Sequence, residues 1–201
     1  MAAPTQLTPG AEELAQAVRE LMDATVRAQG GDLAKAAELV RDATASLTDL
    51  RDAPWVPDGA SSSPYNAVLG TGNPLAAPAR LTSRTPEGVT GTVRFGTTYE
   101  GAPGLVHGGV LAMVMDQVFG EAGMAAHVAG MTIGLEIRYA APTPVHTDLL
   151  LEAHVVTAGE RIVEMAGAIT ANGVTTVTAT ATFFRLTEEH ARRIFPGTRR
   201  A

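Results

Sequence analysis

The sequence predicts an α+β fold in which one antiparallel β-sheet wraps a single long helix, and two observations support this prediction. The first is a stretch from Val110 to about Ala126 whose side chains are apolar nearly all round, as in a helix that is buried on most sides. The second is the order of the elements, since two segments with strand character precede this helix and four follow it.

The strands are predicted from the alternation of apolar and polar side chains. Before the helix, residues 89–95 alternate valine, glycine and phenylalanine with threonine and arginine. Asn172-Gly173 lies between the last two strand segments, and this dipeptide favours a tight hairpin turn, so we expect those strands to pair antiparallel. The same alternation marks four segments after the helix, at 132–140, 146–157, 161–170 and 176–183.

The chain of 201 residues has room for one domain with an appendage. An apolar stripe at helical spacing predicts a hairpin of two N-terminal helices, the second capped by Asp32. This hairpin is expected to pack on the main domain, and a lid over a substrate tunnel is the alternative. The predicted units are an N-terminal helical extension (1–52), an irregular linker rich in proline and glycine (53–73), the main domain (74–186) and a charged C-terminal tail (187–201).

The composition excludes several classes of function. A net charge of −6 argues against broad nucleic-acid binding, and the absence of cysteine excludes disulfides and thiolate chemistry. No signal peptide and no apolar run of membrane-spanning length is visible, so we expect a cytoplasmic protein without membrane contact. The five histidines show no metal-ligand spacing, and phosphate-binding, dinucleotide-binding and serine-hydrolase motifs are missing, so no metal or cofactor is expected.

A candidate site begins with His107-Gly108-Gly109 at the start of the apolar helix. The first N–H groups of a helix have no internal partner and attract negative charge, and glycine lets a ligand approach the backbone closely. Asp116 lies within the same helix, where an ionised carboxylate is costly unless it is hydrogen-bonded or paired. Two interpretations of Asp116 remain open: a core aspartate satisfied by the backbone, or a catalytic carboxylate.

The spacing of His107 and Asp116 limits how they can cooperate. They are nine residues apart, which places them about half a turn out of phase on one helix. They can serve one site only if His107 lies in the loop before the helix, or if the helices of two subunits supply one residue each.

Two motifs resemble a known family. Residues 104–116 read G-x-V-H-G-G-V-L-A-x-x-x-D, and residues 132–142 read T-x-x-L-x-I-x-Y-x-x-P. Both are similar to hot-dog-fold acyl-CoA thioesterases of the phenylacetic-acid-pathway (PaaI) type, and the resemblance covers about 74–186. It implies a hot-dog fold and hydrolysis of an acyl-coenzyme A to free acid and CoA.

The resemblance also implies roles for individual residues. Asp116 would act as general base on water or as the nucleophile, and the N–H of Gly108 would stabilise the oxyanion. His107 would orient the thioester, its alternative being a helix-start histidine bonded to the backbone. Thr132 matches a Ser or Thr near the nucleophilic water in relatives, with an ordinary strand threonine as the alternative.

Further residues are expected to bind substrate. Gly109 is expected to contact the substrate through its backbone at the start of the helix. Arg138 and Arg161 are candidates for the CoA phosphates, although each could be an ordinary solvated charge. Gly101 departs from the family, because some relatives carry an asparagine there that assists the nucleophile.

The expected partners are an acyl-CoA substrate and further copies of the chain, as a homodimer or a dimer-of-dimers tetramer with sites at the subunit interface. The alternative function is a non-catalytic acyl-CoA-binding or scaffold protein with the same fold. A hot-dog dehydratase or hydratase is disfavoured because its motifs are missing.

Overall fold

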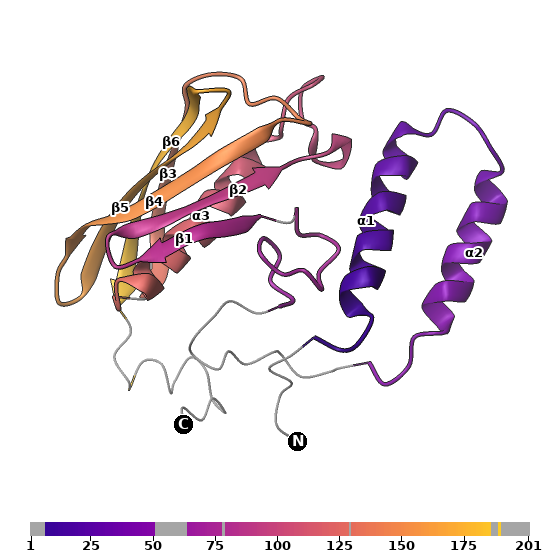
Figure 1. Cartoon of the computed structure of the whole chain (residues 1–201), viewed down its shortest axis with the longest axis horizontal. Helices are drawn as coiled ribbons and strands as arrows, with labels where there is room; N and C mark the ends of the chain where they lie inside the picture. The colour runs from indigo at the N-terminus through magenta and orange to yellow at the C-terminus, as the bar shows by residue number, and fades with distance from the viewer. Residues whose placement is uncertain (1–6, 51–63, 78, 129, 186–188, 190–201) are drawn as a thin grey trace.

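The computed structural model describes residues 7–50, 64–77, 79–128, 130–185 and 189, and it confirms the α+β hot-dog fold (Figure 1). In chain order the elements are α1 (Ala11–Arg27), α2 (Leu33–Ala45), β1 (Arg80–Thr85), β2 (Gly88–Arg94), the 3-10 helix η1 (Thr97–Tyr99), α3 (Gly108–Ala125), β3 (Gly130–Tyr139), β4 (Asp148–Ala158), β5 (Ile162–Ala171) and β6 (Val174–Arg185).

The six strands form one sheet in the order β1-β2-β4-β5-β6-β3, and every neighbouring pair is antiparallel. The predicted turn between β5 and β6 is confirmed, because Asn172 and Gly173 both have positive φ, at 49° and 78°, as a type I′ hairpin turn requires. The first strand after the helix, β3, pairs with the last strand of the chain, β6, and therefore lies at an edge of the sheet.

Helix α3 lies against one face of this sheet (Figure 1). Gly167 of β5 allows the close contact, because a Cβ there would lie 2.7 Å from Cε of Met115 and 3.1 Å from Cε1 of Phe119. The packed side of the helix is fully buried and consists of Leu111, Val114, Met115, Val118, Phe119 and Ala122.

The expectation that α3 is buried on most sides is confirmed, because Gly109 is the one residue of this helix that is exposed. Met113, Asp116 and Gln117 are partly buried. Edge strand β3, in contrast, is exposed along nearly its whole length.

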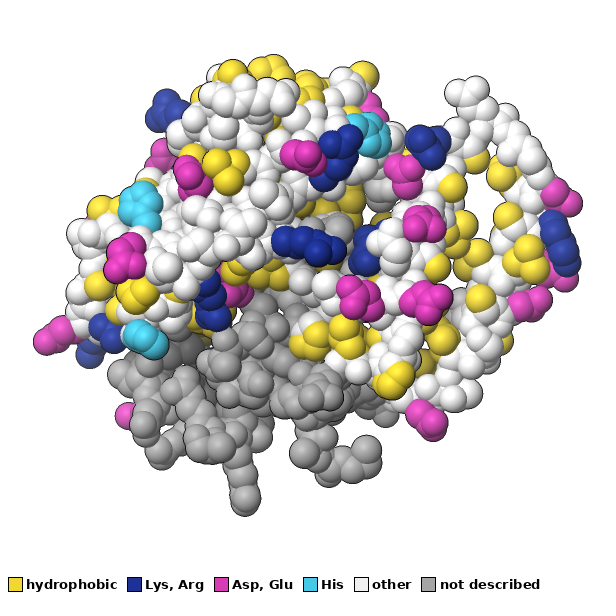
Figure 2. Space-filling view, viewed as in Figure 1, with side chains coloured by type: hydrophobic (Ala, Val, Ile, Leu, Met, Phe, Trp, Pro, Cys, Tyr) yellow, Lys and Arg dark blue, Asp and Glu magenta, His cyan; other side chains and the backbone are white. Residues whose placement is uncertain are grey.

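The two N-terminal helices are present as predicted, and the side chain of Asp32 caps α2 by accepting a hydrogen bond from the N–H of Lys35 at 2.9 Å. Helix α1 is attached to the domain, because it contacts η1 and Arg19 donates to the carbonyl of Asn73 at 3.0 Å. Helix α2 buries none of its residues, and Leu33 is 62 % exposed. The packing predicted for α2 is therefore wrong within one chain, and Figure 2 shows hydrophobic side chains along the gap between α1 and α2.

The described part of the predicted linker, from residue 64, runs through turns and buries Val68 against the core. The remaining linker and the C-terminal tail, apart from Glu189, lie outside the described residues, so the proposed domain boundaries stay predictions. No helix in the described part of the chain is both long and apolar enough to cross a membrane.

Candidate functional site

The site begins where the loop after η1 enters α3. The N–H of His107 donates to the carbonyl of Tyr99 at 2.9 Å, which fixes the end of the loop. Gly101 packs against His107, since a Cβ there would lie only 2.9 Å from Cα of His107. A side chain at Gly101, such as the asparagine of some relatives, would therefore require the loop to shift.

His107 is the N-cap of α3, and its Nδ1 accepts a hydrogen bond from the N–H of Gly109 at 3.0 Å. The backbone hydrogen bond of a helix-start histidine is thus present, and the role of His107 toward a thioester stays a prediction. The same bond fixes the tautomer, because a neutral imidazole that accepts at Nδ1 carries its proton on Nε2. The imidazole is exposed, so Nε2–H can donate to a ligand.

Gly108 is the first residue of α3, and Tyr139 of β3 holds it in place. The hydroxyl of Tyr139 donates to the carbonyl of Gly108 at 2.9 Å. A Cβ on residue 108 would lie 2.9 Å from the same hydroxyl, so the contact requires glycine. The N–H of Gly108 has no partner within the helix, because it belongs to the first turn.

Asp116 lies about two and a half turns after His107 along α3 and faces the other end of β3. Its Oδ1 accepts a hydrogen bond from Oγ1 of Thr132 at 2.7 Å. A carboxylate has a second oxygen, which can take a proton from water or attack an electrophile. The structure therefore brings together the aspartate and the threonine that the sequence singled out.

The structure also separates the two halves of the candidate site. His107 and Asp116 are both attached to α3, and nine residues of helix correspond to about 13 Å along its axis. Within one chain, the helix start and the Asp116–Thr132 pair therefore lie at two different places along β3.

Sequence reasoning missed two features near the site. Tyr139 belongs to the second motif, but its contact with Gly108 depends on how β3 lies against α3. The more deeply buried carboxylate of α3 is Glu121, at 2 % exposure, rather than Asp116. Glu121 accepts from Nε2 of Gln117 at 3.1 Å and lies 3.5 Å from Nε of Arg84, so it is held by an amide and a guanidinium.

The two candidate phosphate-binding arginines occupy different places. Arg161 is exposed in the turn between β4 and β5, and its carbonyl accepts from the N–H of Arg185, which pairs with Gly130 at the start of β3. It therefore lies at the end of the sheet that carries Thr132. Arg138 lies on the outer face of the sheet, opposite to α3, and the structure does not bring it to Asp116.

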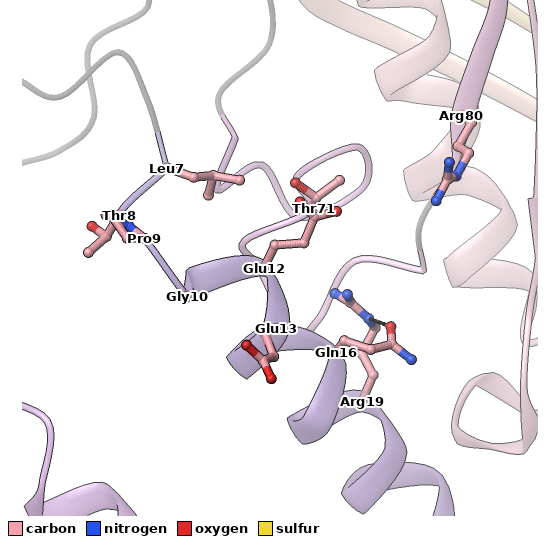
Figure 3. Close-up of a pocket in the computed structure, with 10 residues that line it drawn as sticks. All are labelled: Leu7, Thr8, Pro9, Gly10, Glu12, Glu13, Gln16, Arg19, Thr71 and Arg80. Carbon is pink, nitrogen blue, oxygen red and sulfur yellow. Dashed lines mark hydrogen bonds between the residues drawn. The ribbon is translucent and has the colours of Figure 1, made fainter.

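A pocket of about 710 Å³ lies elsewhere, between the start of α1 and the start of β1 (Figure 3). Arg80 enters it from β1 and Arg19 from α1, and two glutamates of α1 lie on its wall. None of the predicted site residues is among its lining residues. Among the described residues, no group of three or more histidine, aspartate or glutamate side chains could hold a metal ion.

Comparisons with known proteins bear on the fold and the family of the chain. A family model described as thioesterase superfamily matches residues 103–178, which include the whole of α3 and β3. Protein RHA08564, a thioesterase superfamily protein of known crystal structure, is 31% identical, with a TM-score of 0.78 over 90% of this chain and 97% of its own. Its similarity therefore extends into the N-terminal helices. A search of curated protein sequences finds no match.

More distant structures share the fold alone. A Streptococcus pneumoniae hypothetical thioesterase with coenzyme A is 23% identical, with a TM-score of 0.51 over 53% of this chain and 87% of its own. A Streptococcus mutans protein bound to acetyl CoA is 20% identical, with a TM-score of 0.52 over 54% of this chain and 88% of its own. Structures of the S. pneumoniae protein also exist with alanine in place of an aspartate and of a threonine sixteen positions after it.

The similarity to RHA08564 extends over nearly the whole of both chains, and the family model covers the helix start, Asp116 and Thr132. The chain therefore belongs to the thioesterase superfamily.

Proposed function

We propose that this protein is an acyl-CoA thioesterase that hydrolyses an acyl-coenzyme A to the free acid and CoA. The observation that carries the proposal is the 2.7 Å hydrogen bond from Thr132 to Asp116, which holds a carboxylate at the partly open side of α3. A carboxylate in this position suits a general base or a nucleophile.

We further propose that the working unit is a homodimer formed through β3. Among the strands that the structure describes, none pairs with the outer edge of β3, and such edges in native proteins are covered or paired. Its apolar side chains are exposed in the single chain, with Ile133 at 61 % and Tyr139 at 54 %. A second copy pairing antiparallel with β3 would supply hydrogen-bond partners for the backbone groups of the edge strand and would cover these side chains.

Antiparallel pairing of two β3 strands would also complete the site. Thr132 holds Asp116 near the start of β3, and Tyr139 holds Gly108 near its end. Because antiparallel strands run in opposite directions, the start of one β3 would lie beside the end of the partner's β3. Asp116 of one copy would then face the helix start of the other, and the dimer would hold two such sites.

The proposed reaction uses both halves of the site, which are Asp116 of one copy and the helix start of the other. Asp116 takes a proton from a water molecule, and the water oxygen attacks the thioester carbonyl carbon. The carbonyl oxygen becomes an oxyanion beside the N–H of the partner's Gly108, while Nε2–H of the partner's His107 orients the thioester. The C–S bond then breaks, and the proton on Asp116 passes to the CoA sulfur. In the alternative route, Asp116 attacks the carbonyl carbon itself, the C–S bond breaks and CoA leaves as the thiolate. Water then cleaves the resulting anhydride to the free acid and regenerates Asp116, and the CoA thiolate takes up the proton released.

Two comparisons support CoA as the leaving group, since the S. pneumoniae and S. mutans structures contain coenzyme A and acetyl CoA. The aspartate and threonine replaced in the S. pneumoniae variants have the spacing of Asp116 and Thr132, sixteen residues. Gly109 would contribute backbone at the helix start, and Arg161 would approach the CoA phosphates from the Thr132 end of the sheet. The resemblance to the PaaI type places aromatic acyl groups among the substrates to be tested.

The test is release of free CoA thiol from a panel of short, long and aromatic acyl-CoAs. We expect turnover on at least one of them, and Asp116→Asn should lower kcat by about 10²-fold or more while the melting temperature is kept. The amide preserves the shape of the side chain and is cheaper to bury than a carboxylate. A purified wild-type protein that binds CoA but releases no thiol from any member would support the non-catalytic binding protein instead.

A further inference from the structure

A chain of four polar side chains begins beside Asp116 on α3 and connects three segments of the protein. Nδ2 of Asn66 donates to Oε1 of Gln117, the residue after Asp116, at 2.8 Å. Nε2 of Gln117 donates to Oε1 of Glu121 at 3.1 Å, and Nε of Arg84 lies 3.5 Å from Oε2 of the same carboxylate. The segment before β1, helix α3 and strand β1 are thereby linked.

The carboxylate at the buried end of this chain fixes the orientation of both amides. An ionised carboxylate only accepts hydrogen bonds, so Gln117 presents its NH2 group to Glu121 and its oxygen to Asn66. Asn66 must then donate to Gln117, and its own oxygen accepts from the N–H groups of Val68 and Leu69 at 2.7 and 3.0 Å. The one side chain of Asn66 thus closes a turn of its own segment and attaches that turn to α3.

This turn, residues 66–70, is compact. The N–H of Gly70 donates to the carbonyl of Asn66 at 3.0 Å, and a Cβ on Gly70 would collide with the backbone of Asn66. Val68 is buried in the core, and Leu69 packs against the core while partly buried. Figure 1 shows the segment before β1 as an irregular coil between α1 and the sheet. The position of turn 66–70 therefore depends on the packing of Val68 and on the hydrogen bond to Gln117.

The face of α3 that meets turn 66–70 also carries Asp116. Met113 lies three residues before Asp116 and four before Gln117, so the three share one face of the helix, and all three are partly buried. Strand β3 contacts this face at Asp116, and turn 66–70 contacts it at Gln117. A thioester carbonyl carbon that reacts at Asp116 must therefore lie between β3 and the turn.

The chemistry of the turn indicates which part of a thioester it would meet. Leu69 of the turn and Met113 of α3 are apolar and partly buried, so they offer an apolar contact beside the reacting carbon. The CoA side of the thioester carries amides and phosphates, whereas the acyl side is apolar. The acyl side is therefore the better match for this wall.

We propose that turn 66–70 is a wall of the acyl-binding site, and that Asn66 and Gln117 are positioning residues that hold this wall against α3. The inference rests on the proposed thioesterase function and adds a substrate class, which is an apolar acyl group longer than acetyl. Its carbons beyond the carbonyl contact Met113 and Leu69. An acetyl group ends one methyl group after the carbonyl carbon, so it makes the least use of the wall.

The test compares kcat/KM for acetyl-CoA with kcat/KM for longer acyl-CoAs. Asn66→Asp keeps the oxygen that closes the turn and removes the N–H that reaches Gln117. Gln117→Met keeps the length of the side chain and breaks the same contact from the other partner. We expect each variant to lower the ratio of kcat/KM for the best longer acyl-CoA to that for acetyl-CoA by about tenfold, the scale of a lost apolar contact in a pocket.

The ratio separates the wall from the base, because a change that only disturbs Asp116 lowers both values equally and leaves the ratio unchanged. The double variant of Asn66→Asp and Gln117→Met should lose no more than the larger single loss, since both substitutions remove one contact. Melting temperatures are measured for every variant. If Gln117→Met does not fold, because Glu121 loses a donor, the ratio for Asn66→Asp decides.

Gln16→Met is the matched control. Gln16 of α1 also accepts from a neighbouring side chain, Nε of Arg19, and donates to a glutamate four residues later, Glu20. It is exposed and lies on another helix, so the control should keep the wild-type ratio.

The outcomes distinguish this inference from the function on which it rests. A wild-type protein that releases thiol from no acyl-CoA overturns the proposed function and the acyl site with it. An active wild type that prefers acetyl-CoA overturns the wall alone. Unchanged ratios in the folded variants, or equal losses on acetyl-CoA and on longer acyl-CoAs, also overturn the wall and leave the thioesterase function standing.

Discussion

Replacing Thr132 by valine removes the hydroxyl that holds Asp116 and keeps the size and β-branching of the side chain. A hydrogen bond to a charged group contributes about 1.5–3 kcal/mol, which corresponds to roughly 10- to 150-fold in rate. Asp116 is only partly buried and Thr132 is exposed in the single chain, so water can replace the lost donor. We therefore expect the lower end, about a tenfold fall in kcat, with little change in KM because the base and not the CoA contact is disturbed.

The assay is steady-state thiol release from the best acyl-CoA of the panel. Thr132→Ser retains the hydroxyl and should keep most of the activity. Thr92→Val, on the outer face of β2, makes the same chemical change away from Asp116 and should behave as wild type. If Thr132→Val turned over at the wild-type rate while Asp116→Asn was inactive, the hydrogen bond at 2.7 Å would have no part in positioning the base.

Two further predictions follow from contacts around the helix start and η1. Gly108→Ala should lower kcat by about 10²-fold, because the added Cβ would clash with the Tyr139 hydroxyl and move the N–H that stabilises the oxyanion. Gly120→Ala on the same helix is the control, since its Cβ meets open space and the variant should stay active. Equal kinetics of the two variants would contradict the role of Gly108. Burial raises the pKa of Tyr99, whose contribution to stability is full below about pH 10 and is lost as pH rises through the raised value. Urea midpoints measured from about pH 8 to pH 11 should therefore fall more steeply for wild type than for Tyr99→Phe, and parallel curves would refute this.

Much of the fold could be predicted because its signals are local. The apolar run that became α3, the alternation in the strands and the turn at Asn172-Gly173 each depend on residues close in sequence. The family motifs singled out Asp116 and Thr132 separately, and the structure joins them by a hydrogen bond of 2.7 Å.

What sequence could not predict depends on contacts between distant segments. The position of β3 at the edge follows from its pairing with β6, which no local pattern encodes. The burial of Glu121 depends on Arg84 of β1, and the outward direction of Arg138 depends on the strand register after an irregularity near Thr132. Helix α2 shows the opposite error, since its apolar stripe predicts packing that one chain does not provide.

The most direct test of the shared site is complementation between two inactive variants. His107→Ala and Asp116→Ala proteins are mixed in equal amounts, dissociated and allowed to reassociate. Half of the dimers should be mixed, and each mixed dimer holds one site with His107 from one copy and Asp116 from the other. We predict recovery of about a quarter of the wild-type activity. No recovery, with subunit exchange demonstrated by mass, would show that each chain carries its own complete site and would contradict the account.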